Sequence, residues 1–460
     1  MAEAAVDLAV NADERTYPTI LVVDLVWYRA PSTVATDFQT GASRDDSMMP
    51  RRPLCVVLCL AASATLAAQR ASGTLPQEPL ALVNASIVNT RSGAVTRGAS
   101  IVLRGGRIES GGTGGAPAGM RVINLQGRWV TPGLIDAHVH IASLPQMRAA
   151  LDSGVTTVRS AGVSSFVDVG LRDLVKKGFV AGPDMLATGY HVRPFPAPEA
   201  FMDAPDLGDL MGGVTTQDGI RRFVRANLAH GVDWIKVLAT ERAGTPDTDP
   251  RKQVYSEAEL RAIVEEASAR NVSVLAHAHG ADGALAAVKA GVRSIEHGTY
   301  LTDDTLQLMA RQGTFFVPTA DIVNDLAEAG GDYDNASLMR RGQMMRPILK
   351  GAIQRAQKFG VKIAAGSDTG YGPTSVARIS REIGELVAAG LSPLQALQAA
   401  TTVNAELLHL DKQIGVVEAG YEADLLVVDG NPLENVRTLL DPLLVISNGR
   451  IGLDRLSFAK

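Results

Sequence analysis

The amino-acid sequence predicts an α/β protein: a (β/α)8 barrel, or TIM barrel, with a small β-sandwich domain formed from both ends of the chain. Three observations support this prediction. Short strand-like segments occur near both ends of the chain, strand-like and helix-like segments alternate between them, and histidines follow several of the strand-like segments. The 460 residues provide room for a barrel of about 250–300 residues and a smaller module.

An apolar segment near the N-terminus has the organisation of a secretory signal peptide. Arg51 and Arg52 precede an apolar run over 54–66, which ends in small residues at Ala68. The run is too short for a membrane-spanning helix. We therefore expect residues 48–68 to be a signal peptide cleaved near Ala68. The protein would then be secreted or periplasmic, with no stable membrane span after cleavage.

Residues 1–47 precede this signal, although a signal peptide ordinarily starts close to its basic region. Met48 and Met49 lie directly before that region. Our hypothesis is that translation starts there and that residues 1–47 are a non-native upstream extension. N-terminal sequencing of protein from its natural host should find a mature chain that begins after Ala68. A mature chain that retains residues before Met48 would contradict the hypothesis.

The two ends of the chain are expected to form one composite β domain, from residues 69–130 and 415–460. Alternating apolar residues and a glycine pair at Gly105 and Gly106 indicate strands joined by tight turns. The expected strands are 81–84, 100–103, 121–125, 423–428 and 444–447.

The middle of the chain, residues 131–414, is expected to form the barrel. One strand ends at His138, and seven further runs rich in Val, Ile and Thr follow. These runs are 155–159, 184–188, 232–238, 272–277, 292–296, 314–318 and 361–366. Helical segments separate them, most clearly 256–270, where Ser256 and Glu259 make a capping box. Eight strands that alternate with helices favour a closed parallel barrel.

Metal-binding side chains follow four of the expected strands. His138 and His140 are two residues apart, so both face the same side of their strand. The other residues at strand ends are His277, His279, His297 and Asp368. In a parallel barrel these ends share the catalytic face. Both cysteines lie in the expected signal peptide, so the donors are nitrogen and oxygen, which suit zinc and also fit manganese, cobalt or iron.

Lys236 lies within an otherwise apolar strand, and lysine is almost never fully buried without a partner. Two interpretations stay open. Carbon dioxide could carbamylate Lys236, which would then be an anionic bridge between two metal ions. Alternatively, the side chain extends along the barrel wall to place its ammonium group at the rim.

Several motifs resemble those of one enzyme family. Residues 130–140, VTPGLIDAHVH, resemble the signature of the amidohydrolase superfamily, and 294–298 and 366–369 resemble its sixth and eighth strands. Residues 234–237 and 276–280 resemble the prolidase-like branch. That branch contains dipeptidases that act on Xaa-Pro, Xaa-Arg or Xaa-Lys and relatives that cleave other N-acyl amino acids, including ochratoxin-type amides. The resemblance runs from about residue 80 to the end of the chain.

The resemblance implies a binuclear site that holds two divalent metal ions, with zinc favoured. The implied ligands are His138, His140 and Asp368 for the more buried metal, His277 and His297 for the second metal, and carbamylated Lys236 as the bridge. His191, His279 and Tyr255 would contact the substrate. For Tyr255, packing at a helix start is the alternative interpretation.

The implied reaction is hydrolysis of the amide bond of a dipeptide or N-acyl amino acid. A metal-bridging hydroxide would attack, and Asp368 would take its proton and pass it to the leaving amine. One alternative is a mononuclear imidazolonepropionase-like or deaminase-like hydrolase. Those relatives usually carry a glutamate shortly after the fifth-strand histidine, and residues 277–282 contain none. A lactonase or phosphotriesterase at the same binuclear site is a second alternative.

Charge and composition bear on the other possible partners of the protein. The net charge of -5 and the pI of about 5.9 do not suggest nucleic-acid binding. The expected partner is a small-molecule substrate, with specificity expected in the loop 193–213. The oligomeric state, including a homo-oligomer, stays open.

Overall fold

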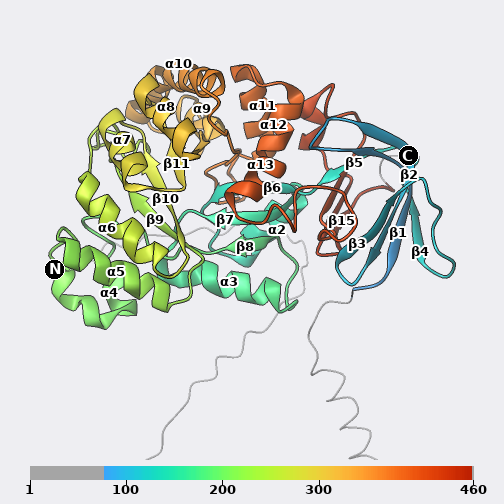
Figure 1. Cartoon of the computed structure of the whole chain (residues 1–460), viewed down its shortest axis with the longest axis horizontal. Helices are drawn as coiled ribbons and strands as arrows, with labels where there is room; N and C mark the ends of the chain where they lie inside the picture. The colour runs from blue at the N-terminus through green and yellow to red at the C-terminus, as the bar shows by residue number, and fades with distance from the viewer. Residues whose placement is uncertain (1–76, 458–460) are drawn as a thin grey trace, which may run out of the picture. The chain divides into compact units, whose positions relative to one another are not determined.

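The structure is a computed structural model that describes residues 77–457 (Figure 1). The expected upstream extension, 1–47, and the expected signal peptide, 48–68, lie outside the described residues. Within 77–457, none of the helices combines the length and the apolar character needed to cross a membrane.

Strands from both ends of the chain share one eight-stranded sheet. The strands are β1 (Leu80–Val88), β2 (Val95–Arg104), β3 (Arg107–Gly112), β4 (Arg121–Asn124), β5 (Trp129–Pro132), β13 (Leu425–Val428), β14 (Leu444–Ser447) and β15 (Arg450–Asp454). The sheet order is β15-β14-β13-β5-β1-β2-β3, with β4 also paired to β1. Blue strands from the first third of the chain and red strands from its end therefore adjoin in Figure 1.

The edge strand β3 curls back around a core to meet the segment just before β13. Ile108 of β3 donates its backbone N–H to Tyr421 O at 2.9 Å, and Ala423 donates to Gly106 O at 2.8 Å, just before β13. Leu82, Ile101, Leu425 and their neighbours fill the enclosed space. The expected turn joins β2 and β3 through Gly105 and Gly106, whose φ angles of 57° and 77° suit a tight hairpin.

Seven parallel strands of the barrel form two arcs. They are β6 (Leu134–Val139), β7 (Val155–Ser160), β8 (Asp184–Leu186), β9 (Trp234–Leu238), β10 (Ser273–Ala278), β11 (Ser294–His297) and β12 (Phe315–Val317). Residue Val192, which follows β8, bridges to Val237 of β9 and joins the arcs. The predicted alternation of strands and helices around a (β/α)8 barrel is confirmed.

The eighth barrel position departs from the expected regular strand over 361–366. The segment makes only isolated bridges, from Ile363 to Phe316 and from Thr369 to Val139. Gly366 explains the irregularity, because a Cβ there would lie 2.7 Å from both His138 Cβ and Val317 Cγ1. Close approach at glycine and a left-handed turn at Asp368 interrupt the ladder, although the segment still closes the ring.

Helices cover the outside of the barrel and complete it. They are α2 (Leu144–Asp152), α3 (Val167–Lys176), α4 (Glu199–Asp203), α5 (Gln217–Ala229), α6 (Glu257–Ser268), α7 (Ala281–Ala290), α8 (Asp303–Gln312), α9 (Ala320–Leu326), α10 (Ala336–Lys358), α11 (Ile379–Ala389), α12 (Pro393–Ala399) and α13 (Thr402–Leu407), with 3-10 turns η1 (Ser164–Phe166), η2 (Pro205–Leu210) and η3 (Val436–Leu440). The predicted capping box of Ser256 and Glu259 begins α6. Asn404 of α13 donates to Ile135 O at 2.7 Å and Ala365 O at 2.8 Å, which joins β6 to the eighth segment.

Candidate active site

The ends of the barrel strands bring two groups of metal-compatible side chains together. The groups are His138, His140 and Asp368, and His277, His279 and His297. Within each group the candidate donor atoms all lie within 4.8 Å of one another. The ring centroids of His138 and His297 are 5.1 Å apart, so the two groups adjoin.

Lys236 of β9 lies beside these groups. Its side chain is buried, and its Nζ is 3.4 Å from His138 Nε2. Burial lowers the pKa of Lys236 to about 8, against the opposing charges of Glu296 and Asp368. A neutral amine is therefore accessible near neutral pH, and this is the form that reacts with carbon dioxide. The amine of Lys236 is therefore buried beside the donors, and its carbamylation stays a prediction.

A buried ion pair orients the first histidine. Glu296 Oε2 accepts from His138 Nδ1 at 2.6 Å, and Arg159 Nη2 donates to Glu296 Oε1 at 2.9 Å. Arg159 also donates to Ala137 O at 2.7 Å. A carboxylate that accepts from Nδ1 leaves Nε2 of His138 free as a donor atom for a metal. The sequence did not indicate this role for Glu296. Its strand is buried throughout, and a carboxylate in such a strand requires a partner.

The first donor group fits a cation. A carbonyl oxygen only accepts, so the Nδ1 of His140 must donate its hydrogen to Gly162 O at 2.8 Å. In the neutral ring, Nε2 then presents a lone pair to Asp368 Oδ1, 3.0 Å away. Two acceptors at this distance repel each other unless a proton or a cation lies between them. His138 Nε2, 3.4 Å from the same Oδ1, completes a nitrogen and oxygen set suited to zinc.

The second donor group is oriented in the same way. His277 Nε2 lies 3.2 Å from Glu241 O, so Nε2 is the donor and Nδ1 is free. Thr319 donates to Pro318 O at 2.7 Å, so its hydroxyl accepts from His297 Nδ1 at 2.7 Å. Burial lowers the pKa of His277 and His297 well below the ordinary value. Both rings are therefore neutral at pH 7, which is the form that binds metal.

Backbone strain is concentrated at the site. His297, Thr319 and Asp368 adopt positive φ angles of 72°, 51° and 54°, in the left-handed region that non-glycine residues avoid. Each such residue costs on the order of 1–3 kcal/mol and persists only where its surroundings enforce it. Asp136 helps to enforce the turn at Asp368, because it accepts from Ser367 N at 2.9 Å and from Tyr371 OH at 2.8 Å.

Asp368 is held as a carboxylate. Burial alone would raise its pKa, yet the adjoining His138, His140 and Lys236 outweigh burial and keep the pKa of Asp368 well below its usual range. An ionised carboxylate at the mouth of the barrel can bind a cation and accept a proton. The catalytic role of Asp368 stays a prediction.

His191 and His279 reach the same cavity, as the substrate-contact expectation requires. His191 donates from Nε2 to Ala161 O at 2.7 Å, which leaves Nδ1 free. His279 Nδ1 lies 2.9 Å from Thr299 Oγ1, and its ring stacks on His297 at 4.6 Å between centroids. Because His279 is as close as the expected ligands of the second metal, its assignment to substrate rather than metal stays a prediction.

Tyr255 does not reach the cavity. Its buried hydroxyl donates to Val214 O at 2.8 Å, and the residue is not among those that line the site. The expected substrate contact is therefore replaced by the packing role. The reason is tertiary: the loop after α4 and η2 passes over Tyr255 and provides a carbonyl for its hydroxyl.

The cavity above the histidines has a volume of about 40 Å³, enough for a few waters or ions. Arg242, Gly244 and Tyr333 contribute to its wall. Residues 193–213, where specificity was expected, do not line it. The loop after β9 and the segment after α9 do so instead. The sequence carried no specific signal for Arg242 or Tyr333.

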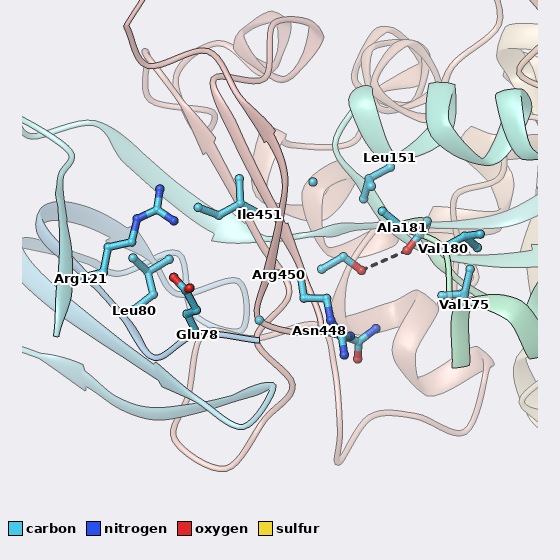
Figure 2. A pocket seen from close by; sticks show the side chains of 14 residues that line it. Glu78, Leu80, Arg121, Leu151, Val175, Val180, Ala181, Asn448, Arg450 and Ile451 are labelled. Carbon is cyan, nitrogen blue, oxygen red and sulfur yellow. Dashed lines mark hydrogen bonds between the residues drawn. The ribbon is translucent and has the colours of Figure 1, made fainter. Parts of the chain in front are cut away.

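Figure 2 shows a second and larger cavity, of about 360 Å³, lined by residues of the β sheet and of the barrel. At its wall Ser447 donates a hydrogen bond to Gly182 O at 3.4 Å. Its charged lining residues include Glu78 and Arg121, and the described lining contains no histidine. The metal-compatible donors are therefore gathered in the smaller cavity.

Known proteins share both the sequence and the fold. The chain is 28% identical over 355 residues to an ochratoxinase from Aspergillus niger, covering 68% of this chain and 73% of that protein. A crystal structure of an Xaa-Pro dipeptidase with bound methionine matches with a TM-score of 0.72 and 27% identity, over 81% of this chain and 99% of that one.

A prolidase complexed with N-methylphosphonate-L-proline matches with a TM-score of 0.71 and 29% identity, over 81% of this chain and 99% of that one. Residues 129–452 match the model of the amidohydrolase family. This span contains all eight barrel positions and every donor of the two groups. The chain belongs to the amidohydrolase family, and it is a hydrolase.

Proposed function

We propose that the protein hydrolyses the amide bond of a dipeptide or an N-acyl amino acid with two divalent metal ions, most suitably zinc. The single observation that carries the proposal is the buried amine of Lys236, 3.4 Å from His138 Nε2, beside two adjoining groups of metal-compatible donors. A carbamate on Lys236 would provide the anionic oxygens that a pair of cations requires.

The residues suit this pair of metals in number and type. His138, His140 and Asp368 would hold one ion, and His277 and His297 the other, with the carbamate of Lys236 between them. Formation of the carbamate joins the lysine nitrogen to the carbon of carbon dioxide and releases one proton. When bound, two divalent ions supply hydroxide near neutral pH and polarise the scissile carbonyl.

Asp368 would transfer the proton. Its carboxylate is ionised and adjoins the donors of the first group, so it can accept the proton of the attacking water. It would then deliver that proton to the leaving nitrogen, because an amide nitrogen leaves poorly as an anion. His191 and His279 would contact the substrate from the cavity wall.

The mononuclear alternative has less support from the same residues. Imidazolonepropionase-like or deaminase-like chemistry needs one metal and would leave a buried lysine beside it without a role. In this chain Lys236 is buried at the donors, and residues 277–282 contain no glutamate. A lactonase or phosphotriesterase would use the same two metals. Assays with lactones, phosphotriesters and amides as substrates distinguish these activities.

A substrate screen tests the proposal. Full-length protein purified with zinc and bicarbonate should cleave Xaa-Pro or Xaa-Arg dipeptides or N-acyl amino acids. Chelator treatment should reduce the rate to background, and added zinc should restore it. The reason is that the proposed reaction depends on the metal ions to supply hydroxide. A protein that cleaves only lactones or phosphotriesters would contradict amide hydrolysis, whereas the binuclear site would stand.

A further inference from the structure

One charged residue in the wall of the cavity has no role so far. Arg242 follows β9 on a loop and lines the cavity together with His191 and His279. Within residues 77–457, no carboxylate forms an ion pair with it. An arginine in the wall of a small cavity without an acidic partner is a candidate for binding an anionic ligand group.

The loop that carries Arg242 is fixed from outside the cavity. Arg341 of α10 donates to four backbone carbonyls of this loop, at 2.5–3.0 Å. The acceptors are Ala243 O, Thr245 O, Pro246 O and Thr248 O. Such a clamp sets the backbone on the C-terminal side of Arg242 before any ligand arrives. Arg341 is therefore a positioning residue.

The N-terminal side of the loop is fixed as well. Glu241 pairs with Lys252 at 2.6 Å and accepts from Asp249 N at 2.9 Å. Thr248 donates its hydroxyl to Arg242 O at 2.5 Å. With both flanks held, little ordering of the backbone remains when a ligand binds the guanidinium, and preorganised contacts of this kind increase affinity.

The guanidinium of Arg242 lies near the histidines of the cavity. Burial is the main cause that lowers the pKa of His279 to about 3, and the charge of Asp368 opposes this shift. The charges of Lys236, Arg341 and Arg242 act in the same direction as burial. Arg242 likewise contributes to the lowered pKa of His191. These effects show that the guanidinium lies close enough to act on the histidines of the cavity, whose wall also contains the carboxylate of Asp368.

We propose that Arg242 binds the free carboxylate of the substrate and thereby selects dipeptides and N-acyl amino acids over their amides. This inference rests on the proposed function and names a specificity-determining residue for it. The planar guanidinium matches the two oxygens of a carboxylate, which a lysine or histidine does not. Arg242 would take the role expected of Tyr255, whose hydroxyl is engaged elsewhere.

The test compares two arginines of the same loop. Arg242→Gln removes the charge in the cavity, whereas Arg251→Gln removes an exposed charge that pairs with Asp249 at 2.9 Å. Calorimetry on the zinc-loaded proteins measures binding of L-leucine and of L-leucinamide. Hydrolysis of N-acetyl-L-leucine and of N-acetyl-L-leucinamide gives KM and kcat for the same pair of end groups.

We expect wild type and Arg251→Gln to bind L-leucine about ten-fold to a hundred-fold more tightly than L-leucinamide, the range of a charge-assisted contact. Arg242→Gln should bind both about equally. It should lose the free-acid preference through KM rather than kcat. Arg341→Gln should lose part of it, because only the placement of the loop changes.

The binding measurements test the role of Arg242 independently of the proposed hydrolysis. A wild type without preference for the carboxylate, or an Arg242→Gln variant that retains it, would overturn the role of Arg242 even if amides are cleaved. Failure to cleave any amide would overturn the proposed function. In that case, a preference for L-leucine over L-leucinamide that is lost in Arg242→Gln and retained in Arg251→Gln would still support an anion site at Arg242.

Discussion

Asp368→Asn is expected to lower kcat by at least about 10²–10⁴-fold, the contribution of general acid–base catalysis, with a much smaller change in KM. Asparagine preserves the size of the side chain and one oxygen, but its amide cannot accept the proton of the attacking water. Steady-state kinetics on an N-acyl amino acid substrate measures both constants.

Metal loss could lower the rate for a different reason, because Asp368 is also an expected ligand. Metal content should therefore be measured on the same preparations, and excess zinc should be added during the assay. A variant that retains both metals and loses kcat would assign proton transfer to Asp368. An Asn variant within a few-fold of wild type would remove Asp368 from the catalytic role.

Lys236→Ala is expected to have a similarly large effect. Wild type should contain about two divalent ions per chain, and the variant should contain fewer and be almost inactive. The physical reason is that two adjoining cations repel each other unless an anion lies between them. Alanine removes the amine on which the carbamate forms. Elemental analysis gives the metal content, and the substrate screen gives the activity.

A matched lysine provides the control. Lys362 lies in the eighth barrel segment, but its side chain is half-exposed and pairs with Glu406 on the outside. Lys362→Ala should therefore retain both metals and activity. Short carboxylic acids such as propionate should partly restore activity to Lys236→Ala, because they can place a carboxylate in the vacated space. A wild type with one metal and an indifferent Lys236→Ala variant would favour the imidazolonepropionase-like reaction.

The expected location outside the cytosol and the upstream extension depend on residues outside the described part of the chain, so they stay predictions. The identity of the metal and the carbamate are likewise proposals, to be tested by the metal analysis above. The family match over residues 129–452 and the structural neighbours agree with the strand pattern of a barrel.

The sequence by itself determined the features that depend on local periodicity. Apolar runs located the barrel strands, and Ser256 with Glu259 located the start of α6, because hydrophobic alternation and capping act over a few neighbouring residues. The sequence also predicted that His138 and Asp368 lie at the ends of strands. Parallel strands place such ends on one face whatever the details of packing.

The tertiary structure decided which side chains become partners. Glu296 meets Arg159 and His138, Tyr255 turns to Val214 O, and Arg341 reaches the loop of Arg242 from a helix 93 to 98 residues later in the chain. These pairings follow from how the loops and helices pack, and local pattern does not encode them. The eighth barrel segment is irregular for the same reason. Gly366 allows the backbone to approach His138, and only the closed ring requires that approach.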